Sequence, residues 1–321
     1  MGTLLVTGGA GFIGSTLAKQ AISRGWNVRI LDNLSTGLKS TIEKLRKQGA
    51  DIIVGDIRDK ALVNSCLKSC DAVVHLAAQV SVPHSVSNPE ENFNTNVHGT
   101  TNVIEGCFSN NVPKMVMASS AAVYGEANDL PLIEEDAGDL LSPYAESKWE
   151  NESQVLEARG KGLQVTALRF FNVYGVGQRP DGAYAAVIPK FVDMMAQGIT
   201  PILNGDGLQT RDFVHVRDVC EAIFLLIEGE SKLPLHHVYN VATQTQISLL
   251  DLIESINTSL TKQKTNLSPI EPEYGPERVG DIRYSMANIE RIKNGLRWTP
   301  TIEFQEGIDE IVQERLSLNK E

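Results

Sequence analysis

The chain has 321 residues, of which 42% are hydrophobic and 21% are charged, so it is long enough for a large core and for two lobes. Its formal net charge of −11 argues against binding to nucleic acid or to an anionic membrane, although a local basic pocket for phosphate is compatible with it. No targeting segment and no apolar run near the ~18 residues that span a bilayer is present, and we therefore expect a cytoplasmic protein.

The first half of the chain alternates short apolar runs with helical patterns. The runs predict strands over 3–8, 27–32, 51–56, 71–78, 114–120 and 164–171. The helical patterns cover 12–25, about 89–110 and 143–160. Near-continuous apolar strands between helices predict an α/β fold, a doubly wound parallel sheet with helices on both faces. Right-handed crossovers then place the carboxyl ends of the strands on one edge of the sheet.

The pattern changes from about Gly177. Helices are predicted over 183–198, 219–229 and 248–260, and irregular segments such as the Pro- and Gly-rich 268–281 join them. We expect a first domain over 1–176 and a smaller mixed α/β lobe over 177–321, with the chain returning to the first domain around 212–242. The four cysteines, Cys66, Cys70, Cys107 and Cys220, form no CxxC pair, so we expect buried thiols and no metal site.

A glycine-rich turn lies between the first strand and the first helix. The segment TGGAGFIG (7–14) contains a GxGxxG pattern, whose glycines allow the backbone to approach a pyrophosphate at the helix N-terminus. Asp32 lies 18 residues after Gly14, where a carboxylate accepts from both ribose hydroxyls and repels a 2′-phosphate. The pattern predicts a Rossmann domain that binds NAD rather than NADP. Asp56 and residues 76–78, at the ends of two later strands, would suit adenine and a ribose.

A tyrosine and a lysine are spaced for joint action on one helix face. Tyr144 and Lys148 are four residues apart, and Ser120 ends a strand at the same sheet edge. Tyrosine, with a free pKa of about 10, is a poor base. A nearby ammonium group and a positive nicotinamide favour the phenolate. The three residues therefore predict a hydride-transfer site that removes a proton from an alcohol.

With these motifs in place, the chain resembles the extended short-chain dehydrogenase/reductase superfamily, and within it the nucleotide-sugar epimerases and dehydratases. The resemblance rests on TGGAGFIG, SSAAVYG (119–125), YAESK (144–148) and RFFNVYG (169–175), and it runs from Thr3 to the C-terminal helix. It implies that Tyr144 is the base, that Lys148 holds the nicotinamide ribose, and that Ser120 bonds the sugar hydroxyl. The NAD contacts that it implies, together with those from the motifs, are Gly8, Gly11, Phe12, Ile13, Gly14, Asp32, Asn33, Leu34, Ser35, Thr36, Gly37, Asp56, Ile57, Leu76, Ala77, Ala78, Asn96, Ser119, Tyr144, Lys148 and Phe171.

The two residues after Ser120 narrow the reaction. The dehydratases of this superfamily carry an Asp-Glu pair where Ala121 and Ala122 stand, and the UDP-glucuronate decarboxylases tend to carry a glutamate there. Elimination of water needs that acid and base. With two alanines, reversible oxidation and reduction remain, as a 4-epimerase requires, and NAD should stay bound through turnover.

Later segments bear on the sugar nucleotide. By this resemblance Asn172 is placed to bind the diphosphate or the sugar, and Arg211 and Arg278 suit a diphosphate. Ser285 matches a position that often controls room beside the sugar C2 substituent. The substrate contacts expected on this resemblance are Ser81, Ser120, Tyr144, Asn172, Val187, Lys190, Leu203, Asn204, Arg211, Arg278, Asp281 and Ser285.

A serine at the position of Ser285 leaves space for an N-acetyl group, which favours UDP-GlcNAc and UDP-GalNAc, with UDP-Glc and UDP-Gal also accepted. A register shift of one residue would put Tyr284 there and restrict the enzyme to UDP-Glc and UDP-Gal. Two further hypotheses are a UDP-glucuronate 4-epimerase, which needs an additional cation for the C6 carboxylate, and a non-catalytic NAD-binding sensor. Val80 stands in a region where galactose-restricted members carry a lysine. The same resemblance implies that the helices near 89–110 and 143–160 pair in a four-helix homodimer interface, although an apolar stripe on them is also compatible with packing inside the monomer.

Overall fold

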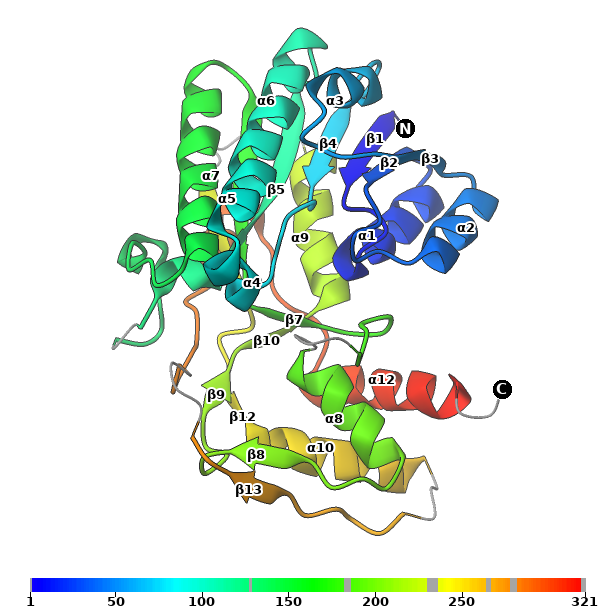
Figure 1. Ribbon diagram of the computed structural model, residues 1–321, viewed down its shortest axis with the longest axis vertical. Helices are drawn as coiled ribbons and strands as arrows, with labels where there is room; N and C mark the ends of the chain where they lie inside the picture. The colour runs from blue at the N-terminus through cyan, green and yellow to red at the C-terminus, as the bar shows by residue number, and fades with distance from the viewer. Residues whose placement is uncertain are drawn as a thin grey trace.

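The computed structural model describes residues 2–126, 129–181, 186–229, 236–263, 267–277 and 282–318. A parallel sheet with helices on both faces forms the larger part, and a smaller lobe lies beyond one end of its strands (Figure 1). No helix within these residues is both long and apolar enough to cross a membrane.

The main sheet has seven strands, and all of its neighbouring pairs are parallel. In spatial order they are β11 (Val238–Val241), β6 (Gln164–Phe170), β5 (Lys114–Ser120), β4 (Ala72–His75), β1 (Thr3–Thr7), β2 (Asn27–Asp32) and β3 (Asp51–Val54). This order confirms the predicted doubly wound α/β fold. The order in which strands are added to the sheet reverses at β1: β2 and β3 lie on one side of it and β4, β5 and β6 on the other. Such a switch point opens a crevice at the carboxyl ends of the strands.

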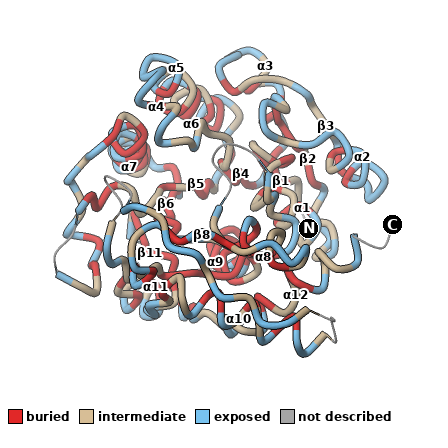
Figure 2. Tube along the Cα trace, turned by 60° about the horizontal axis from the view of Figure 1, so that its bottom comes forward, coloured by how far each residue is buried: buried red, intermediate tan, exposed pale blue. Residues whose placement is uncertain are grey.

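Both faces of the sheet are buried, as near-continuous apolar strands require. Leu4 and Val6 belong to one hydrophobic cluster, whereas Leu5, between them, belongs to the other. The strands are accordingly buried over most of their length, except for the edge strand β3, whose residues are exposed or half-buried (Figure 2). The cluster of Leu4 includes residues of α1 (Phe12–Ser23), α2 (Lys39–Lys47), α9 (Val216–Glu228) and α11 (Glu290–Leu296). The cluster of Leu5 includes residues of α3 (Lys60–Cys66), α6 (Gly99–Ser109) and α7 (Pro143–Gly160).

The prediction of one continuous helix over about 89–110 is wrong, because the helix is interrupted. The segment folds as α5 (Pro89–Phe93), a wide π turn η1 (Asn94–His98) and α6, after the short helix α4 (Val82–Ser87). Asn96 in the wide turn is buried and bonds to Gln79 and Ser147. The interruption therefore accompanies a specific polar contact beside the carboxyl end of β4, and hydrophobic periodicity does not report such a contact.

In its described residues, the smaller lobe contains three helices and three short strand pairs. The helices are α8 (Val187–Ala196), α10 (Leu249–Lys262) and α12 (Phe304–Leu318). The pairs are β7 (Asn172–Tyr174) with β10 (Phe213–His215), β8 (Ile202–Asn204) with β13 (Glu273–Gly275), and β9 (Thr210–Arg211) with β12 (Ile247–Ser248). The three helices share a hydrophobic cluster. The helix predicted from 183 begins in part outside the described residues, and its described portion is α8.

The second half of the chain contributes to both parts. After β10 it forms α9 on one face of the main sheet, and it then adds β11 beside β6. Short 3-10 turns, η2 (Ala121–Tyr124) and η3 (Glu134–Asp136), lie between β5 and α7. The four cysteines are free and buried.

Candidate active site

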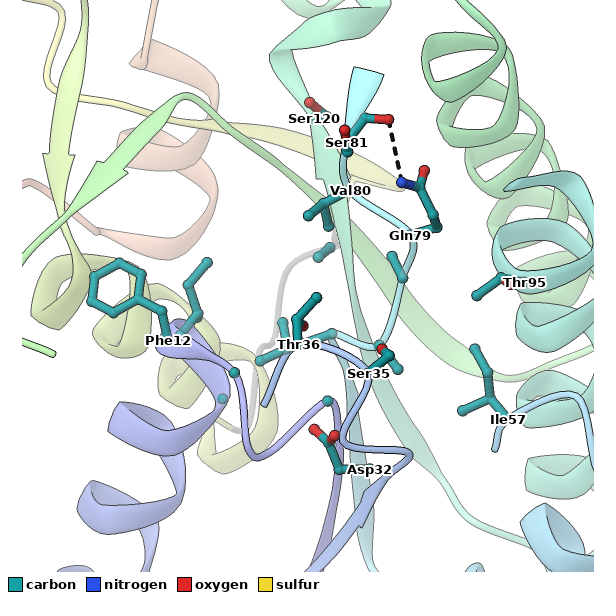
Figure 3. Close-up of a pocket in the computed structure, with 18 of the residues that line it drawn as sticks. Phe12, Asp32, Ser35, Thr36, Ile57, Gln79, Val80, Ser81, Thr95 and Ser120 are labelled. Atoms are coloured by element: carbon teal, nitrogen blue, oxygen red, sulfur yellow. Dashed lines mark hydrogen bonds between the residues drawn. The ribbon is translucent and has the colours of Figure 1, made fainter. Parts of the chain in front are cut away.

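A cavity of about 710 Å³ opens at the carboxyl ends of the main sheet. Its wall comes from the turn after β1 and from the ends of β2, β4, β5 and β6, together with the start of α7 (Figure 3). The predicted NAD contacts on this wall are Gly8, Gly11, Phe12, Ile13, Gly14, Asp32, Asn33, Ser35, Thr36, Ile57, Leu76, Ala77, Ala78, Ser119, Tyr144, Lys148 and Phe171. The structure therefore brings most of that set together.

The glycine turn leaves no room for side chains. Gly8 has φ +71°, and a Cβ there would lie 2.7 Å from the backbone nitrogen of Ala77. A Cβ on Gly14 would lie 2.2 Å from the carbonyl oxygen of Gly8. The bare backbone and the N-terminus of α1 thus face the cavity and fit the pyrophosphate of a dinucleotide.

Asp32 fixes this turn and is itself 9% exposed. One carboxylate oxygen accepts from the backbone N–H of Ala10 and the other from that of Leu34, both at 2.8 Å. Because each carboxylate oxygen can accept a second hydrogen bond, Asp32 can still bind a ribose hydroxyl. The residues around this end of the cavity therefore fit NAD.

Four predicted NAD contacts do not line the cavity: Leu34, Gly37, Asp56 and Asn96. The carboxylate of Asp56 accepts from the side chains of Arg58 and Asn33, and the hydrogen bonds from Arg58 hold its pKa well below the usual range. Asp56 and Asn96 therefore contact residues that line the cavity without lining it themselves. Arg58, Gln79, Val80, His84, Thr95 and Gln178 line the cavity, although the sequence reasoning missed them as contacts. Gln79 and Val80 directly follow the predicted 76–78, which was the available signal.

Ser120, Tyr144 and Lys148 all lie on the cavity wall. Ser120 ends β5, and the other two occupy the first turns of α7. Ser142 caps this helix by accepting from the backbone N–H of Ala145, and Pro143 fills its first turn, so the local sequence determines where α7 begins. Tyr144 is 9% exposed and Lys148 is 5% exposed. The ammonium nitrogen of Lys148 donates to the carbonyl oxygen of Ala118 at 2.9 Å and lies 5.9 Å from the centroid of the Tyr144 ring.

The acid–base properties of this pair differ from the expectation of a favoured phenolate. Burial raises the pKa of Tyr144, and the hydrogen bond with Ser120 opposes that shift. Burial also lowers the pKa of Lys148 to about 8, against the attraction of Glu152. The buried protein environment alone therefore disfavours both charged forms. A positive charge placed in the cavity would favour the phenolate of Tyr144.

Ser119 contacts a buried ion pair, Glu152 with Arg169, that was not predicted from the sequence. Its hydroxyl donates to Glu152, whose carboxylate also accepts from Nε and Nη2 of Arg169 at 2.8 and 2.7 Å. The signal was the spacing, because Glu152 lies four residues after Lys148, as Lys148 lies four after Tyr144. Arg169 lies within the RFFNVYG segment.

The predicted substrate contacts are more dispersed. Ser81, Ser120 and Tyr144 line the cavity, whereas the remaining described members do not. Leu203 is fully buried in the core of the smaller lobe, so the structure does not expose it to a ligand. Arg211 donates to the carbonyl oxygen of Ile282 at 2.7 Å. The others in the smaller lobe or on the segments that lead to it are Asn172, Val187, Lys190, Asn204 and Ser285. Arg278 and Asp281 lie outside the described residues.

Comparisons with known proteins agree with this geometry. The model of the NAD dependent epimerase/dehydratase family matches residues 4–242. A Methanocaldococcus jannaschii protein, provisionally named a UDP-glucose 4-epimerase, is 38% identical over 312 residues, 96% of this chain and 97% of the relative. A UDP-N-acetyl-alpha-D-glucosaminuronate decarboxylase of Bacillus cytotoxicus is 30% identical over 318 residues, 96% of each chain.

A solved structure, the UDP-N-acetylglucosamine 4-epimerase from Methanobrevibacter ruminantium M1 in complex with UDP-N-acetylmuramic acid, is similar over the whole chain. It is 35% identical, has a TM-score of 0.91, and covers 100% of this chain and 99% of its own.

Proposed function

This chain belongs to the NAD-dependent epimerase/dehydratase family, and on that premise we propose that it is a UDP-sugar 4-epimerase that interconverts UDP-GlcNAc and UDP-GalNAc. It also accepts UDP-Glc and UDP-Gal in this proposal. The residues of 1–176 bind NAD, and those of 177–321 supply most contacts to the UDP-sugar.

One observation carries the reaction type. Ser120, Tyr144 and Lys148 meet on the cavity wall, while the adjoining turn η2 begins with the methyl side chains of Ala121 and Ala122. A hydroxyl, a phenol and an ammonium group can move the proton of a sugar hydroxyl, but the two alanines cannot serve as the acid and base of an elimination. The proposal therefore favours epimerisation over the decarboxylation named for one relative.

In the proposed mechanism each residue has one role. NAD, when bound against the glycine turn and Asp32, supplies a reversible hydride acceptor. Tyr144 takes the proton of the C4 hydroxyl as C4 is oxidised, and returns it when the sugar has turned over and is reduced on its other face. Ser120 bonds the same hydroxyl and orients it, since its own side chain lies within hydrogen-bond reach of Tyr144. Lys148 provides the positive charge that favours the phenolate.

The N-acetyl preference is supported by the segment around Ser285. Tyr284 is exposed and its ring lies under the guanidinium group of Arg283, which pairs with Asp206. Tyr284 is thus held at the surface against Arg283, whereas Ser285 is half-buried, and this difference supports Ser285 over Tyr284 at the sugar. The complex of the similar epimerase with UDP-N-acetylmuramic acid supports the same class of substrate.

The test is to incubate purified protein, without added NAD, with UDP-GlcNAc and separately with UDP-Glc, and to follow the anomeric signals by proton NMR. We expect UDP-GalNAc and UDP-Gal to appear, because NAD remains bound through turnover. Conversion of UDP-Glc alone would favour an enzyme restricted to UDP-Glc and UDP-Gal, in which Tyr284 closes the pocket. No conversion of either, with and without added NAD, would contradict the proposal and leave the UDP-glucuronate epimerase or the sensor.

A further inference from the structure

Helix α7 presents three functional side chains along one stripe. Tyr144, Lys148 and Glu152 follow at intervals of four residues, which places them on one face of the helix. The first two line the cavity, and Glu152 lies behind it, 5% exposed. The hydroxyl of Ser119, next to Ser120, donates to the Glu152 carboxylate. Glu152 thus contacts the end of β5 that carries Ser120.

The other side of Glu152 is held by Arg169 on β6. This guanidinium is 2% exposed and binds both carboxylate oxygens, and its Nη1 donates to the hydroxyl of Tyr124 at 2.9 Å and to the carbonyl oxygen of Glu134 at 2.7 Å. A bidentate pair of this kind allows one geometry only.

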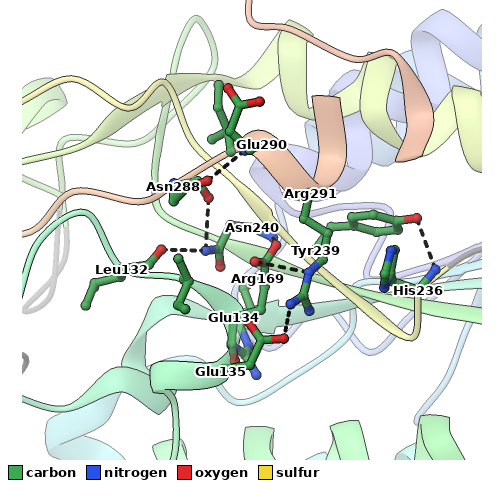
Figure 4. Close-up of polar contacts among 12 residues, drawn as sticks. Leu132, Glu134, Glu135, Arg169, His236, Tyr239, Asn240, Asn288, Glu290 and Arg291 are labelled. Carbon is green, nitrogen blue, oxygen red and sulfur yellow. Dashed lines mark hydrogen bonds and ion pairs between the residues drawn. The ribbon is translucent and has the colours of Figure 1, made fainter. Parts of the chain in front are cut away.

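The contacts continue from Arg169 into the segment that carries Ser285. Asn240 accepts from the hydroxyl of Tyr124 at 2.6 Å. Its side-chain amide nitrogen donates to the carbonyl oxygens of Leu132 and Asn288 (Figure 4). The side chains of Glu134 and Arg291 lie in the same cluster (Figure 4). The rigid surroundings of Glu152 therefore extend well beyond the ion pair.

We propose that Glu152 is a positioning residue, whose carboxylate, fixed by Arg169, keeps Lys148 in its ammonium form beside Tyr144 and holds the end of β5 in place. A buried ion pair need not add to stability, because its desolvation cost rivals its Coulombic gain. Here the carboxylate is the charged group that favours the ammonium form of a lysine whose pKa burial lowers. The catalytic consequence, though not the charge effect itself, rests on the proposed function.

Among the titratable groups around Lys148, Glu152 is the one whose negative charge favours the ammonium form. Tyr144 lies one turn before Lys148 on α7, and the ring of His75 on β4 is buried, with a pKa near 3, so that it is neutral at working pH. On the other elements packed against α7, His84 of α4 pairs with Glu91 of α5 at an exposed site. Lys114, at the start of β5, donates to the carbonyl oxygen of Ile227. Arg169 of β6 and Tyr124 of η2 face the far side of Glu152.

The direct test is to titrate Lys148 by carbon-13 NMR in protein labelled at lysine Cε, with its signal identified by its absence from Lys148→Arg. We expect Glu152→Gln to lower the midpoint of Lys148, about 8 in the parent, by about one unit or more, because loss of the negative charge disfavours the ammonium form. Glu152→Asp keeps the charge and should return the midpoint towards the parent value. The alkaline limb of the kcat profile should move with the midpoint in each variant.

A matched control is Asp218→Asn. Asp218 is also a buried carboxylate and accepts from Thr301 and Ile302, and a merely structural loss there should leave the Lys148 midpoint in place. If Glu152→Gln does not fold, the double variant Glu152→Gln, Arg169→Met removes both buried charges, leaves neither unpaired, and should also lower the midpoint.

An unchanged midpoint in the folded variant that lacks Glu152 overturns the inference. A lowered midpoint in a protein that epimerises no UDP-sugar would sustain it and contradict the proposed function instead.

Discussion

Tyr144 is the residue on which the proposed chemistry depends. We expect Tyr144→Phe to lower kcat by about 10²–10⁴-fold, the usual contribution of a general base, while the protein still folds and retains its NAD. NMR of the sugar signals and the NAD released on denaturation measure the two effects separately. Tyr274→Phe, the same change at an exposed position on β13, is the control and should keep full activity. Full turnover by the Tyr144 variant would remove this residue from the mechanism.

Lys148 makes the reaction sensitive to alkaline pH. Its pKa, lowered by burial to about 8, means that the ammonium form is present below pH 8 and is lost as the pH rises through that value. Because Tyr144 then loses the charge that favours its phenolate, we expect kcat to fall above about pH 8. A pH–rate profile measures this, and a plateau that continues through pH 10 would contradict it.

Ser285 determines the predicted breadth of substrate. Ser285→Tyr should abolish conversion of UDP-GlcNAc while sparing UDP-Glc, because a tyrosine would fill the room beside the C2 substituent. The ratio of kcat/KM for the two substrates measures the effect. Tyr284→Ser, at the exposed neighbour, serves as the control and should change that ratio little. If the two variants behaved in the opposite way, the register of this segment would be shifted by one residue.

Two helices allow the glycine turn to be tested against a neutral site. A Cβ on Gly14 in α1 would collide with the Gly8 carbonyl, whereas one on Gly160 at the end of α7 would meet nothing within 4 Å. We expect Gly14→Ala to lower the free energy of unfolding by about 1–3 kcal/mol, as overpacking does, and to weaken NAD binding. Gly160→Ala should leave it unchanged or raise it by up to about 1 kcal/mol. Denaturant unfolding and NAD content report both results, and equal behaviour of the two variants would contradict the argument.

The elements show what the sequence could predict. The six strands and α7 were found because they combine continuous hydrophobicity or a clear cap with adequate length, and α7 spans the predicted residues. The strands β2 and β5 were also predicted to the residue, but β1, β3, β4 and β6 end one to three residues early. At those ends the backbone leaves the sheet to form the cavity wall. Short strands such as β9, with two residues, carry no periodicity of their own.

The residues of the site also divide into those that the sequence could predict and those that it could not. Residues in contiguous motifs, such as the glycine turn and Tyr144 with Lys148, could be located from spacing alone. The bond between Ser119 and Glu152 and the pairing of Glu152 with Arg169 could not, because they join β5, α7 and β6 through buried side chains. The raised pKa of Tyr144 also depends on burial, which no local pattern reports.

The molecule as a whole exposes apolar side chains on one group of neighbouring helices. Phe93 on α5, Phe108 on α6, and Trp149 and Leu156 on α7 are at least partly solvent-exposed. These are the helices that resemblance assigns to a homodimer interface, and Trp149 and Leu156 are seven residues apart, so they share a face of α7.

We expect the protein to sediment as a dimer and Leu156→Lys to shift it towards the monomer. Leu225→Lys, which places the same charge at an exposed position on α9 across the sheet, is the control and should remain dimeric. Analytical ultracentrifugation decides between these outcomes. A parent protein that sediments as a monomer would exclude the interface.

The position of β11 beside β6 has a consequence for folding during translation. The ribosome delivers β1 to β6 first, then β7, α8, β8, β9, β10 and α9, and only afterwards the strand that covers the outer edge of β6. Until then the nascent chain carries an unpaired strand edge, the kind of surface on which polypeptides aggregate. Translation that pauses between β6 and β11 therefore leaves the chain at its most vulnerable, and truncation after β6 yields a sheet that lacks its last strand.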